Sequence, residues 1–284
     1  MTLPISGRTR VVGVWGSPVS HSLSPRMHNA ALAVLGVDWV YVPYTVQPDH
    51  AEAAVQAVRA LDLVGVNVTV PLKERIAPYL DHVDEAAVRI GSINTIKNDG
   101  GVLTGYSTDG EGFVRDLQDL GWPTERLNVY LLGAGGSARA LAYALAEREC
   151  HVVIANRTAA RAEDLTELVN RYFPGSSTVA PWGGAAGAKI DLMVNTTSLG
   201  MTPQVDDAPE LPSGNFTGVR YVYDIIYNPE ETRFLRGARE AGCSTSNGLG
   251  MLVRQGAAAL GIWLERPIGP EALAAMELAV ASRT

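Results

Sequence analysis

The stretch Val129-Tyr-Leu-Leu-Gly-Ala-Gly-Gly-Ser-Ala138 decides the fold of this 284-residue chain. An apolar, strand-like run ends at Gly133, and helix-forming residues begin at Ser137. Gly133, Gly135 and Ala138 fit the spacing G-x-G-x-x-G/A, in which the first glycine permits a tight turn and the second lets a pyrophosphate approach the backbone. A glycine-rich turn without a ligand would look similar, but the flanking strand and helix favour a dinucleotide site. The phosphates would bind along Gly133, Ala134, Gly135, Gly136, Ser137 and Ala138, at the positive end of the helix dipole.

The residues after the next predicted strand discriminate between the two nicotinamide cofactors. An NAD enzyme usually carries an acidic residue there, about 20 residues after the loop, but this chain has Asn156, Arg157 and Thr158. A carboxylate would repel a ribose 2′-phosphate, whereas Arg157 can pair with it, and Arg161 follows on the same helical face. Thr158 can cap the helix or bond to the phosphate. The pattern therefore predicts NADP, the alternative being an exposed arginine pair without a ligand.

Strands and helices alternate on both sides of this loop, which predicts an α/β protein with mostly parallel sheets. Residues 109–247 should form a doubly wound, Rossmann-type NADP domain. Residues 1–108 and the helical tail 248–284 should form a discontinuous substrate-binding domain, with the site in the groove between the domains. Strands are expected at 11–15, 39–46, 65–70, 127–132, 151–155, 190–195 and 219–226, and helices at 25–35, 51–61, 137–149, 159–171, 251–263 and 270–283.

The composition excludes several classes of protein. With 23 basic and 30 acidic residues the net charge is −7, so a nucleic acid is not an expected partner. No apolar run is long enough to span a bilayer, the N-terminus does not have the pattern of a signal peptide, and two cysteines fit a reducing compartment. We therefore expect a cytoplasmic monomer or homodimer that acts on a small molecule and contacts neither nucleic acid nor membrane. The histidines and cysteines show no metal-binding spacing.

Polar residues gather in four clusters before the loop. Ser22 and Ser24 stand at a predicted helix start, where Ser24 can serve as the N-cap or both hydroxyls can face one anion. Lys73 is expected in the first turn of a helix after Pro71, where the dipole disfavours a cation and favours proton transfer; an exposed lysine is the alternative. Asn94 and Asp109 are each more typical of turns than of ligands. Only their occurrence together indicates a site.

These clusters, in this order before the glycine-rich loop, resemble the shikimate dehydrogenase family over nearly the whole chain. Members of that family reduce 3-dehydroshikimate to shikimate with NADPH in aromatic amino-acid biosynthesis. The matching segments are Ser20–Pro25, Asn67–Glu74, Ile93–Thr95, Ser107–Gly110, Gly133–Ala138, Asn156–Thr158, Asn195–Ser198, Asp224–Tyr227 and Gly248–Gln255.

The resemblance implies a role for each matched residue. Lys73 and Asp109 would be the catalytic pair, with Lys73 as the acid and base. Ser22 and Ser24 would bind the substrate carboxylate, and Tyr227 would close the site. Thr69, Asn94, Asp109 and Gln255 would bind the ring hydroxyls together with Lys73. Besides the loop and the segment from Asn156 to Arg161, the cofactor site would include Thr197, Ile225, Gly248 and Glu85.

The chain departs from the family pattern at two positions. Ser107 stands where the family usually has asparagine, and Ile225 stands where many members have methionine. We expect both changes to have small effects. Three alternatives remain open at this point: an NAD-dependent quinate/shikimate dehydrogenase, an enzyme for an aminoshikimate-type substrate, and a non-catalytic NADP-binding sensor.

Overall fold

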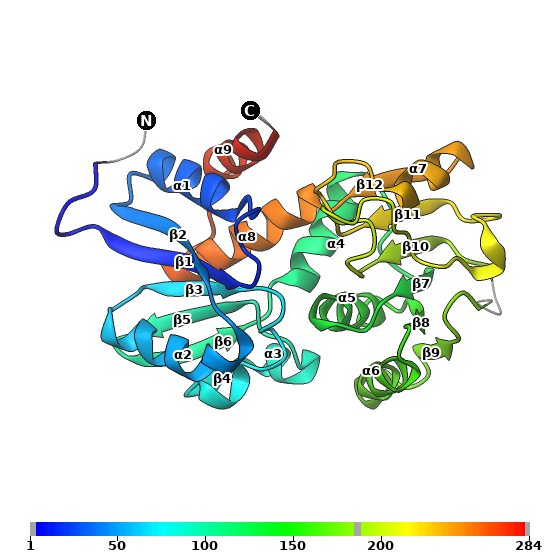
Figure 1. Ribbon diagram of the computed structural model, residues 1–284, viewed down its shortest axis with the longest axis horizontal. Helices are drawn as coiled ribbons and strands as arrows, with labels where there is room; N and C mark the ends of the chain where they lie inside the picture. The colour runs from blue at the N-terminus through cyan, green and yellow to red at the C-terminus, as the bar shows by residue number, and fades with distance from the viewer. Residues whose placement is uncertain (1–3, 185–188, 282–284) are drawn as a thin grey trace. The chain divides into compact units, whose positions relative to one another are not determined.

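The structure is a computed structural model that describes residues 4–184 and 189–281. The chain divides into two compact units. Unit 1 contains the chain up to Gly112 and from Leu252 onward, and unit 2 runs from Phe113 to Met251. Each unit is built on one six-stranded sheet with helices beside it (Figure 1). Among the described residues, no helix is long and apolar enough to cross a membrane.

The sheet of unit 1 is mixed, with the strand order β2-β1-β3-β5-β6-β4. β1 pairs in parallel with β2 and β3, whereas β5 runs antiparallel to β3 and β6. Gly100 and Gly101 form the tight turn between β5 and β6 with positive φ values of 59° and 96°, a conformation that favours glycine. The elements are β1 (Arg10–Gly16), α1 (Ser24–Leu35), β2 (Trp39–Thr45), η1 (Pro48–His50), α2 (Ala51–Ala60), β3 (Gly65–Val68), η2 (Ala77–Tyr79), β4 (His82–Val83), α3 (Glu85–Ile90), β5 (Thr95–Asp99), β6 (Val102–Tyr106), α8 (Leu249–Leu264) and α9 (Pro270–Ala281).

Apolar side chains from helices cover this sheet. Val55 and Val58 of α2 belong to one core cluster with Val66 and Ile96 of the strands. The indole of Trp263, in α8, packs so close to Gly65 that a Cβ there would collide with it. α1 packs against α9, and the two helices lie side by side in Figure 1. The C-terminal helices therefore complete the core of unit 1, although they lie far from the rest of it in the sequence.

The outer edge of β2 is closed by side chains. The Asn29 amide accepts a hydrogen bond from Tyr41 N–H at 2.9 Å and donates one to Tyr41 C=O at 2.9 Å. Two residues further along the same edge, Pro43 has no N–H to offer. Because an open strand edge is a template for pairing with another chain, these two residues protect unit 1 from edge-to-edge association at β2.

The sheet of unit 2 has the order β9-β8-β7-β10-β11-β12, and all its recorded pairings are parallel. This is the 3-2-1-4-5-6 order of the Rossmann fold, with the topological switch between β7 and β10. The elements are α4 (Asp109–Asp119), which begins in unit 1, β7 (Asn128–Leu132), α5 (Gly136–Ala146), β8 (His151–Ala155), α6 (Ala159–Tyr172), β9 (Ser177–Ala180), β10 (Leu192–Asn195), η3 (Pro212–Gly214), β11 (Tyr221–Asp224), α7 (Arg233–Glu240) and β12 (Ser244–Asn247).

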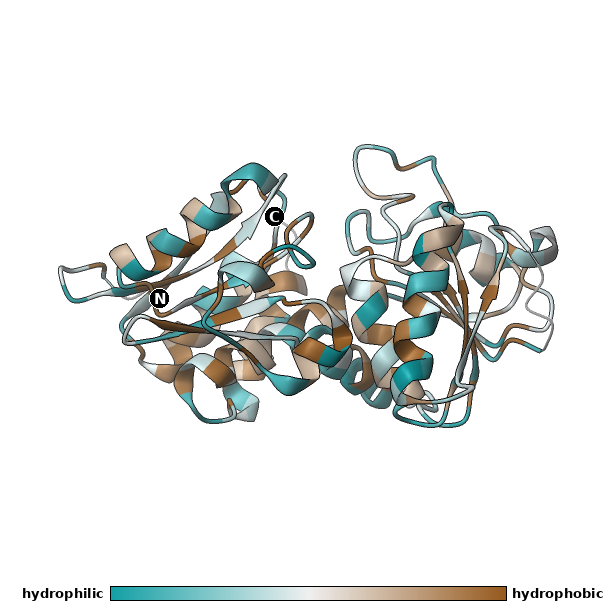
Figure 2. Ribbon diagram, turned by 90° about the horizontal axis from the view of Figure 1, so that it is seen from below, coloured by the Kyte–Doolittle hydropathy of each residue, from teal (hydrophilic) through white to brown (hydrophobic). Residues whose placement is uncertain are grey.

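Helices lie on both sides of this parallel sheet. Phe234 and Leu235 of α7 pack against Tyr130, Met193 and Val222 of the strands. α5 and α6 lie on the opposite side of the sheet from α7 (Figure 1). The central strands β7, β8, β10 and β11 are largely apolar and buried, whereas the edge strands β9 and β12 carry more polar residues. The helices contain both apolar and polar residues (Figure 2). Apolar runs are the pattern expected for strands buried on both faces.

Apart from the helix expected after Pro71, the predicted strands and helices are present, with ends that differ by a few residues. Arg283, the predicted end of the last helix, lies outside the described residues. Mostly parallel pairing is confirmed in unit 2, and in unit 1 three strand pairs are parallel. The two antiparallel pairs of unit 1, β3–β5 and β5–β6, come from a hairpin for which the sequence predicts no strands. Lys97 and Asn98 interrupt the apolar pattern of β5, which is why no strand was expected there.

Candidate active site

Lys73 and Asp109 form a buried ion pair in unit 1. The Lys73 Nζ atom donates to Asp109 Oδ2 at 2.5 Å, and the two side chains are only 12% and 5% exposed. Asp109 is the first residue of α4, where the helix dipole favours a carboxylate. The pair thus holds one transferable proton at a defined place, which is what general acid–base catalysis requires.

The prediction that Lys73 lies in the first turn of a helix is wrong. Residues 70–76 form turns and bends, in which Arg75 N–H bonds to Leu72 C=O at 2.8 Å. Pro78 lacks the N–H that an α-helix begun at Pro71 would need in order to continue, and the segment closes i→i+3 turns instead. The position of the Lys73 ammonium is therefore set by Asp109 and not by a helix dipole.

Asn94 holds the other carboxylate oxygen of Asp109. Its Nδ2 donates to Asp109 Oδ1 and to Thr108 Oγ1, both at 2.8 Å, and lies 3.2 Å from Gln255 Oε1. The side-chain amide of Gln255, in α8, is oriented by a 2.7 Å hydrogen bond from its Nε2 to Leu252 C=O. Residues from three separate segments of the chain thus meet in one buried polar cluster. Thr108 was not singled out as a functional residue, although it lies within the matched segment Ser107–Gly110.

Ser22, Ser24 and Thr69 lie near the ends of β1 and β3. Ser24 was expected as the N-cap of α1, but that position is held by Leu23, and Ser24 is the first helical residue. The Ser22 hydroxyl accepts a hydrogen bond from Ser24 N–H at 3.3 Å instead. Thr69 packs against Gly16, where a Cβ would lie 2.5 Å from its Cγ2. The two serine hydroxyls therefore lie at the N-terminus of α1, a setting that suits an anion.

The glycine-rich loop of unit 2 has the geometry that a dinucleotide needs. Gly133 has a φ of +111°, and a Cβ there would lie 2.5 Å from Thr196 Oγ1, so only glycine fits. No described atom lies within 4 Å of where a Cβ of Gly135 would stand. Ala138 is fully buried in α5, beneath the first helical turn. Ala134, Gly136 and Ser137 complete the turn, and its backbone leaves room for a pyrophosphate at the helix N-terminus.

Asn156, Arg157, Thr158 and Arg161 follow β8, next to the loop. Asn156 Nδ2 donates to Thr158 C=O at 2.9 Å, which shapes this turn. Thr158 is the N-cap residue of α6, but its side chain makes no capping hydrogen bond. Of the two roles expected for Thr158, side-chain capping is therefore not observed. Arg157 is exposed and has no ion-pair partner within residues 4–184 and 189–281, so its guanidinium is available to a phosphate.

Thr197, Ile225 and Gly248 lie at the carboxyl ends of β10, β11 and β12. Ile225 N–H bonds to Asn195 C=O at 3.0 Å, and Gly248 N–H bonds to Ile226 C=O at 3.2 Å. A Cβ on Gly248 would collide with the Ile225 carbonyl, so a glycine is required there. Tyr227 follows in the same loop and is partly exposed. In open parallel sheets, ligands bind beyond this edge of the sheet.

Asp224 and Asn195 organise these loops, and sequence reasoning did not assign them a role. Asp224 is fully buried and accepts hydrogen bonds from Asn195 Nδ2, Ile226 N–H and Thr232 Oγ1 at 3.0, 3.0 and 2.7 Å. Burial raises the pKa of Asp224 to about 7, against the opposing effect of these donors. Asn195 Oδ1 in turn accepts from Thr197 N–H and its hydroxyl. Both residues lie in segments that match the family, Asn195–Ser198 and Asp224–Tyr227, and this match could have identified them.

Glu85, which the resemblance implies as a cofactor residue, makes no contact within the described part of the chain that points to this role. It begins α3 in unit 1 and forms an ion pair with Arg89, and its side chain is 79% exposed. A carboxylate is stabilised at a helix N-terminus and by a basic residue four positions later. These two interactions explain the presence of Glu85 without a cofactor.

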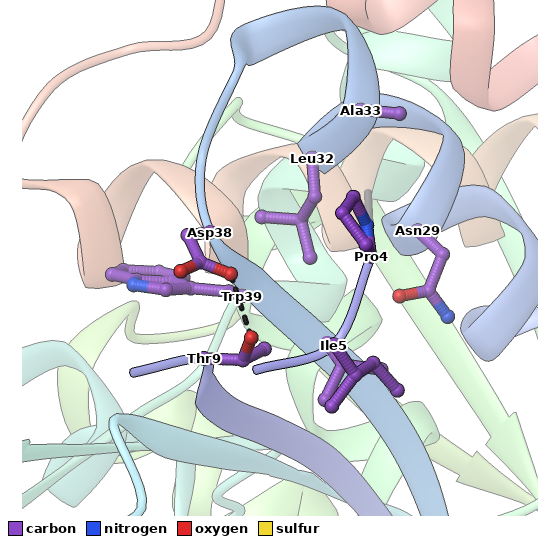
Figure 3. Close-up of a pocket in the computed structure, with 9 residues that line it drawn as sticks. Pro4, Ile5, Thr9, Asn29, Leu32, Ala33, Asp38 and Trp39 are labelled. Carbon is purple, nitrogen blue, oxygen red and sulfur yellow. Dashed lines mark hydrogen bonds between the residues drawn. The ribbon is translucent and has the colours of Figure 1, made fainter. Parts of the chain in front are cut away.

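A metal site and a surface cavity are two further features to compare with the predicted site residues. Among the described residues, no three His, Cys, Asp or Glu side chains are grouped as a metal site would require. A cavity of about 500 Å³ lies on the side of unit 1 next to α1 and β2 (Figure 3). Pro4, Leu32 and Trp39 line it, and none of the predicted site residues does. Thr9 and Asp38 close its polar side through a 2.7 Å hydrogen bond.

Comparison with known proteins identifies the family to which the chain belongs. Residues 14–96 match the family described as "Shikimate dehydrogenase substrate binding domain", and residues 118–174 match "Shikimate / quinate 5-dehydrogenase". The shikimate dehydrogenase (NADP+) of Desulforamulus reducens is 45% identical over 91% of this chain and 91% of its own length.

Solved structures extend this similarity to the whole fold. A shikimate dehydrogenase crystallised with NADP+ is similar with a TM-score of 0.89 and 37% identity, covering 98% of this chain and 96% of that chain. The Thermus thermophilus enzyme crystallised with NADP(H) and shikimate has a TM-score of 0.83 and 35% identity, with coverage of 96% and 98%. With its NADP-type loop and its lysine–aspartate pair, the chain belongs to the shikimate dehydrogenase family of NADP-dependent oxidoreductases.

Proposed function

We propose that this protein catalyses the reversible NADPH-dependent reduction of 3-dehydroshikimate to shikimate, a step of aromatic amino-acid biosynthesis. The observation that carries the proposal is the buried contact between Lys73 Nζ and Asp109 Oδ2, with Asn94 on the second carboxylate oxygen. A glycine-rich loop and a basic turn of NADP type in the same chain support it. The names of relatives over more than nine-tenths of the chain point the same way.

The chemistry requires a proton at the right place. NADPH, when bound, supplies the hydride that reduces the ketone carbon. The ketone oxygen then needs a proton, which the Lys73 ammonium donates, and in the reverse direction the neutral amine takes it back. Asp109 holds Nζ in position during both steps. The burial of the pair keeps bulk water from competing for the proton.

The remaining polar residues of unit 1 would bind the substrate. Ser22 and Ser24, at the start of α1, suit its carboxylate. Thr69, Asn94, Asp109 and Gln255 suit its ring hydroxyls, and Tyr227 is proposed as a further substrate contact. Unit 1 is therefore proposed as the substrate-binding unit.

Unit 2 is proposed as the NADP-binding unit. The pyrophosphate would lie along Gly133 to Ala138, and the 2′-phosphate would lie against Arg157, Thr158 and Arg161. Thr197, Ile225 and Gly248 would line the nicotinamide half, and Glu85 is the further cofactor residue that the family resemblance implies. The protein would work in the cytoplasm as a monomer or homodimer.

Replacing Arg157 with alanine is expected to raise KM for NADP roughly 10–100-fold, because a charge-assisted contact to phosphate contributes about 1.5–3 kcal/mol. KM for NAD, which lacks the 2′-phosphate, should change less than about twofold. Steady-state kinetics with both cofactors measures this difference. Arg171→Ala, at the exposed far end of α6, is the matched control. Equal losses with NADP and NAD would show that Arg157 does not read the 2′-phosphate.

One assay tests the proposed function as a whole. Purified protein is given shikimate or quinate with NADP or NAD, and formation of the reduced cofactor is followed by absorbance. Turnover chiefly with shikimate and NADP is the expected result. Turnover with quinate and NAD would instead indicate a catabolic enzyme. Folded protein that binds NADP but turns over none of the four combinations would indicate a sensor or a different substrate.

A further inference from the structure

A buried chain of hydrogen bonds leads from Tyr41, in the edge strand β2, to the Lys73–Asp109 pair. The Tyr41 hydroxyl donates to Asn67 Oδ1 at 2.8 Å, and Asn67 Nδ2 donates to Thr95 Oγ1 at 3.0 Å. Thr95 Oγ1 then donates to Asn94 Oδ1 at 3.2 Å. Thr95 is fully buried, and the exposed fractions of Tyr41, Asn67 and Asn94 are 1%, 6% and 3%. Because each of these groups is shielded from water, losing a partner is costly.

Backbone groups determine the direction of every bond in this chain. Asn67 Nδ2 also lies 3.1 Å from Asn94 C=O, which can only accept, so this end of the Asn67 side chain must be the NH₂ group. Asn67 Oδ1 therefore faces Tyr41, whose hydroxyl must donate. Thr95 Oγ1 receives one Asn67 hydrogen and has one hydrogen of its own, which goes to Asn94 Oδ1.

The orientation of the Asn94 amide decides whether Asp109 is held. Asn94 Oδ1 accepts from Thr95 Oγ1 and from Thr108 N–H at 2.8 Å, so Nδ2 is left to face the carboxylate. A flipped amide would place an NH₂ group against the Thr108 N–H and an oxygen against Asp109 Oδ1. Both contacts would be repulsive.

We propose, building on the function proposed above, that Thr95 is a positioning residue for the catalytic pair. Its hydroxyl, oriented by Asn67 and Tyr41, fixes the Asn94 amide, which holds the Asp109 carboxylate against Lys73 Nζ. Thr95 touches neither Asp109 nor Lys73 through the bonds described here and acts through Asn94. Side chains from β2, β3 and β5 thereby control the geometry of a proton-transfer site that none of them enters.

Thr95→Val tests this role, since valine keeps the shape of threonine and removes only the hydroxyl. We expect kcat for shikimate oxidation to fall about fivefold to tenfold and KM for shikimate to change less than twofold, because the loss is of alignment and not of binding. The pH profile of kcat should shift as well. Thr95→Ser keeps the hydroxyl and should restore kcat to within about twofold. Tyr41→Phe, two bonds further away, should lower kcat about twofold.

The matched control is Thr104→Val, the same change on the neighbouring strand β6, where the wild-type kcat and pH profile are expected. Circular dichroism would establish that each variant is folded. Should Thr95→Val not fold, Tyr41→Phe tests the same chain. A folded Thr95→Val variant with the wild-type kcat and pH profile would overturn the proposal.

A measurement that does not depend on catalytic activity tests the role of Thr95 independently of the proposed function. The side-chain NH₂ protons of Asn94 should exchange slowly in the wild-type protein and in Thr95→Ser, and at least tenfold faster in Thr95→Val. Amide NMR spectra, assigned with Asn94→Asp, measure this exchange. If the wild-type protein does not oxidise shikimate, the proposed function fails while exchange still decides the role of Thr95. Equal exchange in all three proteins would refute it.

Discussion

Replacing Lys73 with alanine is expected to lower kcat for shikimate oxidation at least about 100-fold with little change in KM, since a positioned general acid or base typically contributes 10²–10⁴-fold. The variant removes the group that exchanges a proton with the reacting oxygen, while Ser22, Ser24 and Gln255 would still bind the substrate. Steady-state kinetics with saturating NADP gives both constants. A variant with near-normal kcat would remove Lys73 from the chemistry.

Lys97→Ala is the matched control for this experiment. Lys97 is also an ion-paired lysine of unit 1, with Nζ 2.5 Å from Glu265 Oε1, but it lies in β5 away from Asp109. Its partner is exposed, so the loss of the ion pair should cost little stability. The kcat of Lys97→Ala should stay within about twofold of the wild-type value. A similar loss of activity in both variants would indicate a general effect of removing a lysine from this unit.

Unit 1 is expected to lose stability as the pH falls below about 6.5, because His28 is buried without a hydrogen-bond partner. Its ring stacks on Tyr41 with centroids 4.2 Å apart, is fully buried, and finds no partner for either nitrogen among the described residues. Burial lowers the pKa of His28 from 6.5 to about 3. The unfolded chain therefore takes up a proton below pH 6.5 that the folded chain refuses. Stability is lost from that point down to about pH 3, by on the order of 4 kcal/mol in total.

His28→Phe should remove this loss while keeping the ring stack. Between pH 7.5 and pH 5 the wild-type protein should lose about 2 kcal/mol more than the variant, because each pH unit below 6.5 contributes about 1.4 kcal/mol. Urea unfolding followed by tryptophan fluorescence measures the difference, since Trp263 lies 5.7 Å from the His28 ring. His50→Gln, at an exposed histidine, is the control. Parallel losses in the wild-type protein and His28→Phe would contradict the prediction.

Asp224 acts in the opposite direction and does not confound this comparison. Its pKa is raised to about 7 in the folded state, so its neutral form is favoured there and its contribution to stability improves as the pH falls from 7 towards 4. The effect is the same in the wild-type protein and in His28→Phe. Only the difference between the two proteins reports on His28.

Local patterns in the sequence were enough to predict the NADP unit and its ligand. Gly133 and Gly135 are needed for backbone conformation and close approach, which depend on immediate neighbours, and Arg157 follows at a characteristic distance along the chain. The strands of this unit are short apolar runs between helices, a pattern that parallel sheets produce. Lys73 and Asp109 could be identified as candidates for the same reason, because each lies in a short polar segment that matches the family.

Local patterns misjudged the segment around Lys73. The sequence suggested a helix after Pro71, but a second proline at position 78 lacks the N–H that such a helix would need in order to continue. The predicted N-cap of α1 is also wrong by one position, because Leu23 and not Ser24 is the N-cap residue. A proline near the start of a helix shows roughly where the helix begins, but not which residue is its N-cap. Helix ends depend on one or two backbone angles, and composition constrains them weakly.

By itself, the sequence determined the alternation of strands and helices, the glycine-rich loop, the preference for NADP and the two residues that we propose as the catalytic pair. Only the tertiary structure decided that Tyr41, Asn67 and Thr95 form one hydrogen-bonded chain to Asn94, and that the buried His28 ring has no hydrogen-bond partner within residues 4–184 and 189–281. Those contacts depend on which strands become neighbours and on how α8 returns to unit 1. Strand pairing between distant segments is settled by the burial of whole faces, which no short stretch of sequence encodes.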